Sequence, residues 1–185
     1  MALINTTTTG VLGSTFYGDG SGNLTVQQNG VNVNTITSAP TFMAYTLTQQ
    51  TISHNSATKV TLNTEEWDTA NCFDTSLSRF TPNVAGYYNF TVQVRFDSSL
   101  AFTNIWTAIY KNGANTYRGF EQSNNPGATY FSQQQNTTHL VYLNGTTDYV
   151  ELYIYQANAS SASCATGYTQ TPFCNRLYGF LARAA

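Results

Sequence analysis

Residues Gly86 to Phe96 read GYYNFTVQVRF, and this stretch decides the fold class of the chain. Apolar or aromatic residues recur at every second position, namely Tyr88, Phe90, Val92, Val94 and Phe96. Because successive side chains of a β-strand point to opposite faces, these five share one face and the polar residues between them share the other. The stretch therefore predicts a strand of an antiparallel sheet that has one face in a core.

Three further stretches alternate in the same way but lack a polar second face. Tyr149 to Gln156 carries three tyrosines there, and both Ile105 to Tyr110 and Leu177 to Leu181 are apolar on both faces. In a sandwich the outer face of such a strand needs a cover, which either a long loop or a second subunit supplies. We expect a subunit interface with these candidate residues: Tyr149, Tyr153, Tyr155, Trp106, Tyr110 and Phe180.

The rest of the chain divides at Ser38-Ala39-Pro40. From Thr41 to Ala185, short alternating runs are separated by turn residues and nothing has a helical period, which predicts one sandwich domain over residues 41–185. Residues 1–40 hold only one charged residue, Asp19, and alternate around Asn29-Gly30 as a short hairpin would. A segment this small cannot bury a core alone, so residues 1–40 are expected to form a β-rich anchor or stalk.

The composition limits the partners of the protein. Of 185 residues, 41% are hydrophobic and 9% are charged, and the net charge is −2, so the chain should fold without a basic face. The seven Lys and Arg residues are scattered, which argues against nucleic acid as a partner. No apolar run reaches the roughly 20 residues that span a bilayer. The start, MALINTTTTG, has neither the basic nor the apolar region of a secretory leader, so synthesis in a cytoplasm is expected.

Residues that could carry catalysis or hold a metal are few. The two histidines, His54 and His139, lack motif partners, so neither a metal site nor a nucleophilic site is predicted. The densest acidic cluster is Glu65, Glu66 and Asp68, with Asp74 nearby. A hydrolase that uses paired carboxylates is the catalytic alternative for this cluster, but carboxylates so close in sequence are usually solvated. We expect a protein that is not an enzyme.

Two further features bear on cofactors and covalent links. The loop Asp19 to Asn23 offers oxygen ligands at alternate positions but lacks the sixth-position glycine and the final glutamate of a calcium loop, so a Gly-rich turn is expected. No cofactor is predicted, and calcium is the alternative. The three cysteines, Cys72, Cys164 and Cys174, are an odd number. Cys164 and Cys174 close a short polar loop, and spacing alone leaves open whether they form a disulfide.

The stretch from Leu62 to Val92 resembles the signature of the globular head domain of complement component C1q, whose fold is shared with the tumour necrosis factor (TNF) superfamily. The spaced pattern of that signature is kept throughout, and only its two outermost aromatic positions are replaced, by Leu62 and Val92. The matching positions are Leu62, Asp68, Phe73, Phe80, Gly86, Tyr88, Phe90 and Val92. Three later segments are similar to strands of the same family: AIYKNG at 108–113, LNGTTDYV at 143–150 and YGFL at 178–181.

The resemblance covers residues 41–185 and implies a ten-stranded jelly-roll of two sheets that assembles as a homotrimer around an apolar axis. The residue pattern agrees with this fold, because the aromatic residues of the signature have the parity of core positions. Gly86 suits a strand that begins close to another backbone. The complete prediction is an all-β, trimeric head that follows a short β-rich anchor or stalk.

A trimeric head of this kind, low in charge and rich in Thr, Asn and Gln, favours a bacteriophage structural protein. It would be a tail fibre, spike or capsid fibre of the virion that attaches to a host receptor or surface carbohydrate, with residues 1–40 docked on other virion proteins; this step is an analogy from the fold. Aromatic candidates for sugar contact are Tyr117, Tyr130 and Trp67. The alternatives are a secreted lectin-like or cytokine-like head, and a capsid decoration or cement protein that binds no receptor.

Overall fold

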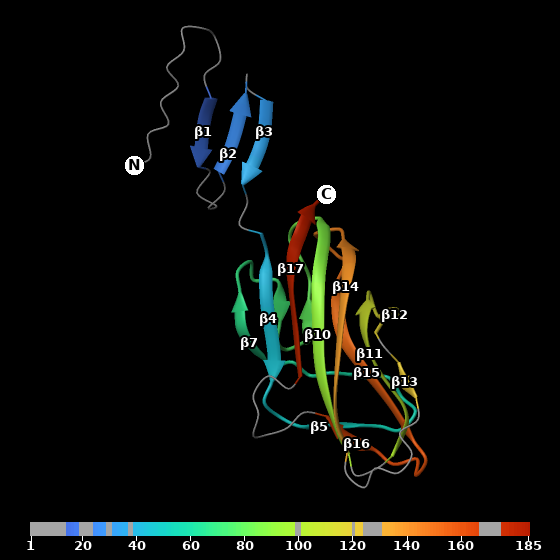
Figure 1. The fold of residues 1–185 in the computed structure, drawn as a ribbon. Coiled ribbons are helices and arrows are strands. Elements are labelled where there is room, and N and C mark those ends of the chain that lie inside the picture. Colours follow the sequence, from blue (N-terminus) through green and yellow to red (C-terminus); the bar gives the residue numbers. More distant parts are fainter. Residues whose placement is uncertain are drawn as a thin grey trace. The chain divides into compact units, whose positions relative to one another are not determined.

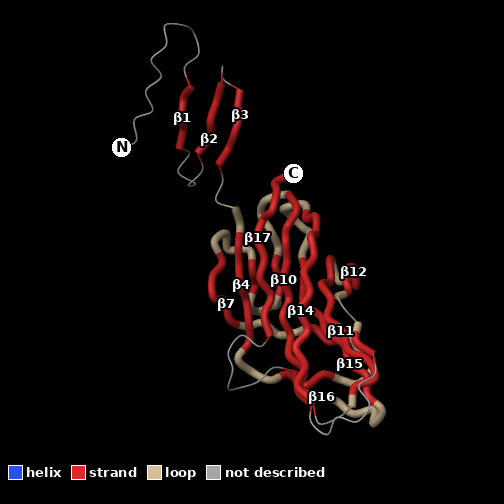
Figure 2. Tube along the Cα trace, viewed as in Figure 1, coloured by secondary structure: helices blue, strands red, loops and turns tan. Residues whose placement is uncertain are grey.

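The protein is described by a computed structural model that covers residues 14–18, 24–28, 31–36, 39–98, 101–119, 121–123, 131–166 and 175–185. Every regular element in these ranges is a β-strand (Figure 2). The chain divides into two compact units, Met1–Ala39 and Pro40–Ala185, and each is considered by itself. We refer to the second unit as the head.

The first unit contains a three-stranded antiparallel sheet. Its strands are β1 (Ser14–Gly18), β2 (Leu24–Gln28) and β3 (Val31–Ile36), in the order β1-β2-β3. The pairing of β2 with β3 confirms the predicted hairpin. The Asn29-Gly30 turn and the Asp19 to Asn23 loop lie outside the described residues.

The head consists of two antiparallel sheets whose strands are far apart in the sequence (Figure 1). The first, sheet 1, has the order β5-β16-β10-β17-β4-β7. Strand β14 pairs with β10 along its whole length, on the edge of β10 opposite β17. Its strands are β4 (Thr41–Thr46), β5 (Gln50–Ile52), β7 (Thr64–Asp68), β10 (Gly86–Ser98), β14 (Phe131–Leu143), β16 (Cys164–Thr166) and β17 (Asn175–Ala184).

The second, sheet 2, has the order β12-β11-β15-β9-β8, with β13 paired to β11 and β6 paired to β15. Its strands are β6 (Thr58–Lys59), β8 (Phe73–Asp74), β9 (Arg79–Phe80), β11 (Phe102–Lys111), β12 (Ala114–Arg118), β13 (Gln122–Ser123) and β15 (Val150–Asn158).

The prediction of an all-β jelly-roll of two sheets is confirmed, whereas the strand count differs from it. The head's described residues contain fourteen strand segments instead of ten. Four of the fourteen are only two residues long, namely β6, β8, β9 and β13. Each of them makes only one or two residue pairs: β13 pairs with β11, β6 and β9 pair with β15, and β8 pairs with β9.

The core lies between the two sheets and is dominated by aromatic rings. All five alternating residues of the Gly86–Phe96 stretch are fully buried, as predicted. Phe80 of sheet 2 stacks on Phe42 of β4 with ring centroids 4.3 Å apart, and meets Tyr88 and Phe90 of β10 edge-on at 5.6 and 5.5 Å. The Tyr88 hydroxyl donates a hydrogen bond of 2.8 Å to the Val84 carbonyl oxygen, so this buried polar group has a partner.

Two other positions of the signature act on the backbone. The Asp68 carboxylate accepts hydrogen bonds from the amides of Ala70, Cys72 and Phe73, the last two at 2.6 Å, and so shapes the turn between β7 and β8. A Cβ atom added at Gly86 would lie 2.4 Å from the Arg183 carbonyl oxygen, so only glycine lets β10 and β17 approach at this point.

Phe80 is the test of this core. Phe80→Ala should lower the free energy of unfolding by about 3–5 kcal/mol, because it removes a buried ring with contacts to both sheets. The matched control is Leu77→Ala in the neighbouring turn, where the side chain is 46% exposed, and its effect should stay within about 0.5 kcal/mol. Urea denaturation of both variants checks this. Equal effects would mean that the ring cluster does not hold the sheets together.

Candidate functional site

The outward side of sheet 1 carries apolar residues from three adjacent strands. Because residues opposite each other in a ladder point to the same side, Phe180 of β17 and Leu140 of β14 face outward in one row, on either side of β10. Tyr87 stands opposite Tyr142 in the next row, with ring centroids 5.5 Å apart. Tyr178 lies two residues before Phe180. We call these five residues the aromatic face: Tyr87, Leu140, Tyr142, Tyr178 and Phe180.

This face is open to solvent. Leu140 is 57% exposed, Phe180 48%, Tyr87 45% and Tyr142 41%. These are four of the seven large hydrophobic side chains that are exposed in the described part of the chain. Single exposed hydrophobic residues are common, but a contiguous group of them on one sheet marks an interaction surface.

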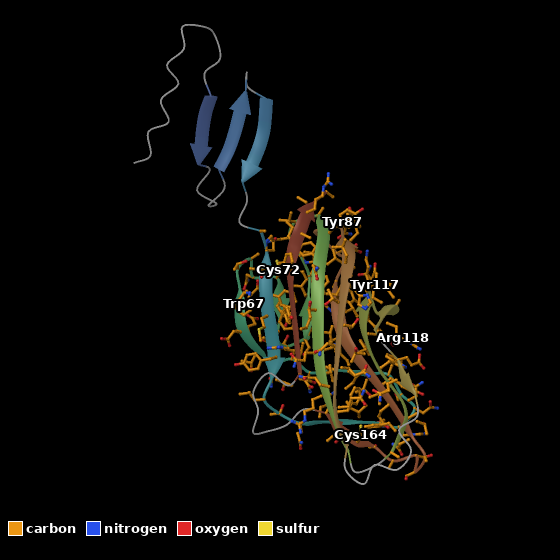
Figure 3. All side chains as sticks on the ribbon, viewed as in Figure 1. Trp67, Cys72, Tyr87, Tyr117, Arg118 and Cys164 are labelled. Carbon is orange, nitrogen blue, oxygen red and sulfur yellow. The ribbon has the colours of Figure 1, made fainter. Side chains whose placement is uncertain are left out.

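The outward side of sheet 1 extends to Trp67 on the edge strand β7. Figure 3 shows Trp67 apart from Tyr87, which lies near the start of β10. Trp67 is paired with Met43 in the ladder, and its indole Nε1 donates a hydrogen bond of 3.3 Å to Thr41 Oγ1. Its side chain is 42% exposed. Trp67, an aromatic candidate from the sequence, therefore lies on the same side of sheet 1 as the aromatic face.

Farther along the same three strands the outward side becomes polar. Thr91 of β10 and Thr138 of β14 are joined by a hydrogen bond of 3.0 Å between their hydroxyl oxygens. Beyond them Gln93 is paired with Arg176, whose guanidinium lies 5.7 Å from the Tyr178 ring centroid. The side is thus mostly apolar near Gly86, where Asn89 stands between Phe180 and Leu140, and polar toward Arg95.

The outward side of sheet 2 is different, and it contains Trp106, one of the predicted interface residues. Trp106 is only 4% exposed. Its ring stacks on Tyr155 with centroids 4.9 Å apart, and the guanidinium of Arg118 lies 4.3 Å from the ring centroid. Trp106 needs no second subunit to cover it, because a cation and a ring of its own chain already do so.

The other aromatic residues on this side are also in contact within the chain. Tyr110 stacks on Tyr153 with centroids 3.8 Å apart, and Arg79 lies 3.7 Å from the centroid of Tyr149. Burial raises the pKa of the Tyr110 and Tyr153 hydroxyls. Of the six predicted interface residues, four lie on strands of sheet 2 and Tyr149 directly precedes β15, and all five are half-buried or buried. Phe180 alone lies on the open side of sheet 1.

A buried carboxylate lies beside these rings. Glu151 of β15 is 3% exposed, and its Oε1 accepts hydrogen bonds from Arg79 at 2.8 and 3.0 Å and from Lys59 Nζ at 3.2 Å. Both cations come from the short strands β6 and β9, so this ion cluster ties those segments to β15. A buried carboxylate that is fully paired with two cations is a structural element, not a free general base.

The acidic cluster proposed as a catalytic alternative does not converge. Glu65 and Glu66 are exposed on β7, where burial and the nearby charge of Asp68 raise the pKa of Glu65. Asp68 binds backbone amides, and the Asp74 carboxylate accepts from the Ser76 hydroxyl and amide, which lowers its pKa. The described residues contain no group of three or more His, Cys, Asp or Glu side chains placed to share a metal ion.

The cysteines are buried thiols where the structure describes them. Cys164 is free, and burial raises its pKa to about 12; Cys72 is free as well, and burial raises its pKa. The disulfide between Cys164 and Cys174 is therefore not formed in this structure, and Cys174 itself lies outside the described residues.

Within the described ranges there is also no helix with the length and hydropathy that crossing a membrane requires.

His139 lies on the inward side of β14, beside the edge strand β12. Its Nε2 is 3.0 Å from Thr137 Oγ1, and its ring is 5.7 Å from that of Tyr117. A Cβ atom added at Gly119 would come within 2.7 Å of Thr137, so the two edges are closely packed here. Tyr117, a sugar-contact candidate, is thus half-buried in a strand contact, and Tyr130 lies outside the described residues.

The C1q domain family matches residues 41–170 of the chain. The chain belongs to this family. The C1q domain occupies the head, and β17 completes sheet 1 beyond the matched residues. No match was found among curated proteins.

Solved structures share the C1q fold at low sequence identity. The globular domain of the zebrafish complement 1qA protein is 16% identical and has a TM-score of 0.56, with 79% of this chain and 99% of that chain covered. The Eiger TNF of S. frugiperda is 12% identical with a TM-score of 0.56, over 80% of this chain and 93% of that one. Murine APRIL is 12% identical with a TM-score of 0.55, over 78% and 99%.

The sequence alone did not identify most of the aromatic face. Tyr87 sits among the polar residues of the Gly86–Phe96 stretch, and Leu140 and Tyr142 alternate in the run HLVYL at 139–143. The signal in the sequence was that these three residues are apolar or aromatic at positions where the alternation would place polar residues. Their proximity depends on the pairing of β10 with β14, which are separated by more than thirty residues in the chain.

His139 should make the stability of the head depend on pH. Burial lowers its pKa below the ordinary value, so as pH falls through about 6.5 the unfolded chain takes up a proton before the folded chain does. Stability is therefore complete above that pH, falls between the unfolded and the folded pKa, and levels off below the folded pKa.

Urea denaturation between pH 8 and pH 5 measures this. His139→Gln should remove the component of the pH dependence that His139 carries, and His54→Gln should leave it in place. An unchanged pH dependence in His139→Gln would contradict the assignment.

Proposed function

We propose that the protein is a binding or structural head, without enzymatic activity, that works as a homotrimer joined through the aromatic face. The single observation that carries this is the contiguous exposed group on sheet 1, in a chain whose other sheet covers its own aromatic residues. Domains of the C1q and TNF families are trimeric. A solvent-exposed apolar sheet face in such a domain is best explained as surface that is buried on assembly.

The physical driving force is the burial of apolar surface. Removing such surface from water contributes roughly 25 cal/mol for each Å². Tyrosine suits this role because its ring buries area while its hydroxyl finds a partner at the edge of the contact. The polar end of the same side, with Gln93 and Arg176, would form the hydrogen-bonding rim.

We further propose that this head belongs to a virion appendage, a bacteriophage fibre, spike or capsid fibre, that contacts the host surface. The support is the low charge of the whole chain, in which 9% of residues are charged, together with a separate N-terminal unit that can serve for attachment. Host contact would involve surface carbohydrate or a receptor bound by loops of the head. The competing hypothesis is a secreted C1q-like head. The two hypotheses differ in where the chain is found, on a virus particle or in the secreted fraction.

Leu140 tests the assembly. Leu140→Asp should convert the trimer to monomers, because it places three carboxylates on surface that is buried in the trimer. Leu77→Asp is the matched control, since Leu77 is a similarly exposed leucine outside sheet 1, and it should leave the mass unchanged. Light scattering coupled to size-exclusion chromatography reads the mass. A monomeric parent protein, or a trimeric Leu140→Asp variant, would overturn the proposed interface.

Cryo-electron microscopy of the particle that contains the chain tests the virion assignment. Trimeric heads should project from the particle surface, with residues 1–39 nearest the attachment point. Particles that lack the chain, together with its recovery as a secreted protein, would favour the competing reading.

A further inference from the structure

Four acceptor motifs for N-linked glycosylation, Asn-x-Ser or Asn-x-Thr, lie in the described part of the head. Their asparagines are Asn89, Asn136, Asn144 and Asn158. An N-linked glycan is bulky and strongly hydrated, so it is compatible only with surface that stays in water. The surroundings of each asparagine therefore decide whether the head can accommodate a glycan there.

Two of the motifs lie on the outward side of sheet 1. Asn89 of β10 is paired with Leu140 on one side and with Phe180 on the other, so it stands within a row of the aromatic face. Asn136 of β14 is exposed and stands opposite Gln93, at the polar end of the same side. A glycan on either asparagine would project from the surface that the proposed trimer buries.

Asn158, the last residue of β15, is only 3% exposed. Its Nδ2 donates hydrogen bonds to Gln156 Oε1 at 2.8 Å and to the Ala162 carbonyl oxygen at 2.6 Å. A sugar on Nδ2 would remove one of these two N–H donors and would have to fit where there is almost no access to solvent. Because a buried acceptor that loses its donor destabilises a fold, a glycan here is incompatible with the head itself, whether or not three copies associate.

Asn144 is the contrasting case, because it lies in the turn between β14 and β15 and its side chain is partly exposed. Its Oδ1 accepts hydrogen bonds from the amides of Thr146, Thr147 and Asp148. Its Nδ2 makes one hydrogen bond, of 2.9 Å, to Thr147 Oγ1. A glycosylated Nδ2 retains one N–H, so this turn keeps its hydrogen bonds when a sugar is attached.

We infer that the head can be built only where N-linked glycosylation does not reach the chain. Glycans at Asn89 and Asn136 would block assembly, and a glycan at Asn158 would block folding. For Asn89 and Asn136 this rests on the proposed trimer, whereas for Asn158 it rests on the head alone. The proposed function thereby gains a compartment: the head assembles in a cytoplasm, where a virion is also built, and not along a glycosylating secretory route.

The modification is the transfer of an oligosaccharide from a lipid pyrophosphate donor to the asparagine side chain. The bond between the anomeric carbon of the first sugar and the pyrophosphate oxygen breaks, and a bond forms between that carbon and Nδ2. Nδ2 gives up one proton, and the lipid pyrophosphate leaves. The transfer takes place on the chain as it is made, before β10 pairs with β14 and β17. Strand pairing therefore does not protect Asn89, and burial does not protect Asn158.

The experiment is expression of the full chain behind a cleavable secretory leader in a eukaryotic cell. Asn5→Gln and Asn23→Gln are present in every protein compared, because those two motifs lie outside the described residues. With all four head motifs intact, the chain should yield no secreted trimer. Blocking the synthesis of the lipid-linked oligosaccharide in the same cells should restore the trimer. Native mass and glycopeptide mass spectrometry read both results.

The matched variant removes three motifs and keeps their asparagines, through Thr91→Val, Thr138→Val and Ser160→Ala. Thr91 and Thr138 bond to each other through their hydroxyls, valine is favoured in strands, and Ser160 is exposed. This variant retains the Asn144 motif and should be secreted as a trimer. A secreted trimer from the chain with all four motifs would overturn the inference, and so would a lack of trimer from both the variant and the inhibited cells.

Variants that keep a single head motif separate assembly from folding. The chain that keeps only the Asn89 motif should be secreted as a folded, glycosylated monomer. The chain that keeps only the Asn158 motif should be retained in the cell, and the chain that keeps only the Asn144 motif should be secreted. Equal secretion of the last two as glycoproteins would overturn the assignment of Asn158.

Failure of this inference is distinguishable from failure of the proposed function. If Leu140→Asp separates the copies in a bacterial cytoplasm while a glycan on Asn89 does not do so in the secreted protein, the inference fails and the proposed interface stands. If the parent protein is a monomer in the bacterial cytoplasm, the proposed trimer fails, and the comparison of the Asn158 and Asn144 motifs still tests the remaining part.

Discussion

The two-residue period of strand β10 is the constraint on which the head depends. Its inward residues, from Tyr88 to Phe96, are fully buried and meet Phe42 and Phe80 in one aromatic cluster. The same period leaves Tyr87 on the outward side, where β14 places Tyr142 opposite it and β17 places Phe180 in the next row, opposite Asn89. The strand that builds the core therefore also fixes the position of the candidate interaction surface.

The two sheets treat their outward aromatic residues in opposite ways. On sheet 2, the stacked pairs Trp106–Tyr155 and Tyr110–Tyr153 are covered by one another and by arginines, and the Glu151 cluster holds the neighbouring short strands in place. On sheet 1 the rings are more exposed: Lys111 Nζ and the Arg176 guanidinium lie 5.7 Å from the ring centroids of Tyr142 and Tyr178, and Phe180 stays 48% exposed. This asymmetry is what distinguishes a surface that is complete in one chain from a surface that gains stability on association.

The proposed assembly would use the aromatic face of the head. Three heads that meet through sheet 1 also bring together three copies of residues 1–40, which contain a single charged residue, Asp19. Linkage of this kind raises the effective concentration of the joined segments for one another. The low charge of the whole chain is consistent with contacts that depend on apolar surface and on neutral polar groups.

The sequence by itself determined the fold class, the position of the core and the C1q family, because a two-residue alternation and the spacing of Phe73, Phe80, Gly86, Tyr88 and Phe90 are local properties of the chain. It also indicated the hairpin of β2 and β3. Tertiary structure alone decided which apolar strand faces are open. Alternation shows that Trp106 and Phe180 both point away from the core, but whether such a face is covered depends on side chains that arrive from distant strands, such as Arg118 beside Trp106. Phe180 and Leu140, on either side of Asn89, stay about half exposed instead, and long-range pairing of this kind is not encoded in the period of any single strand.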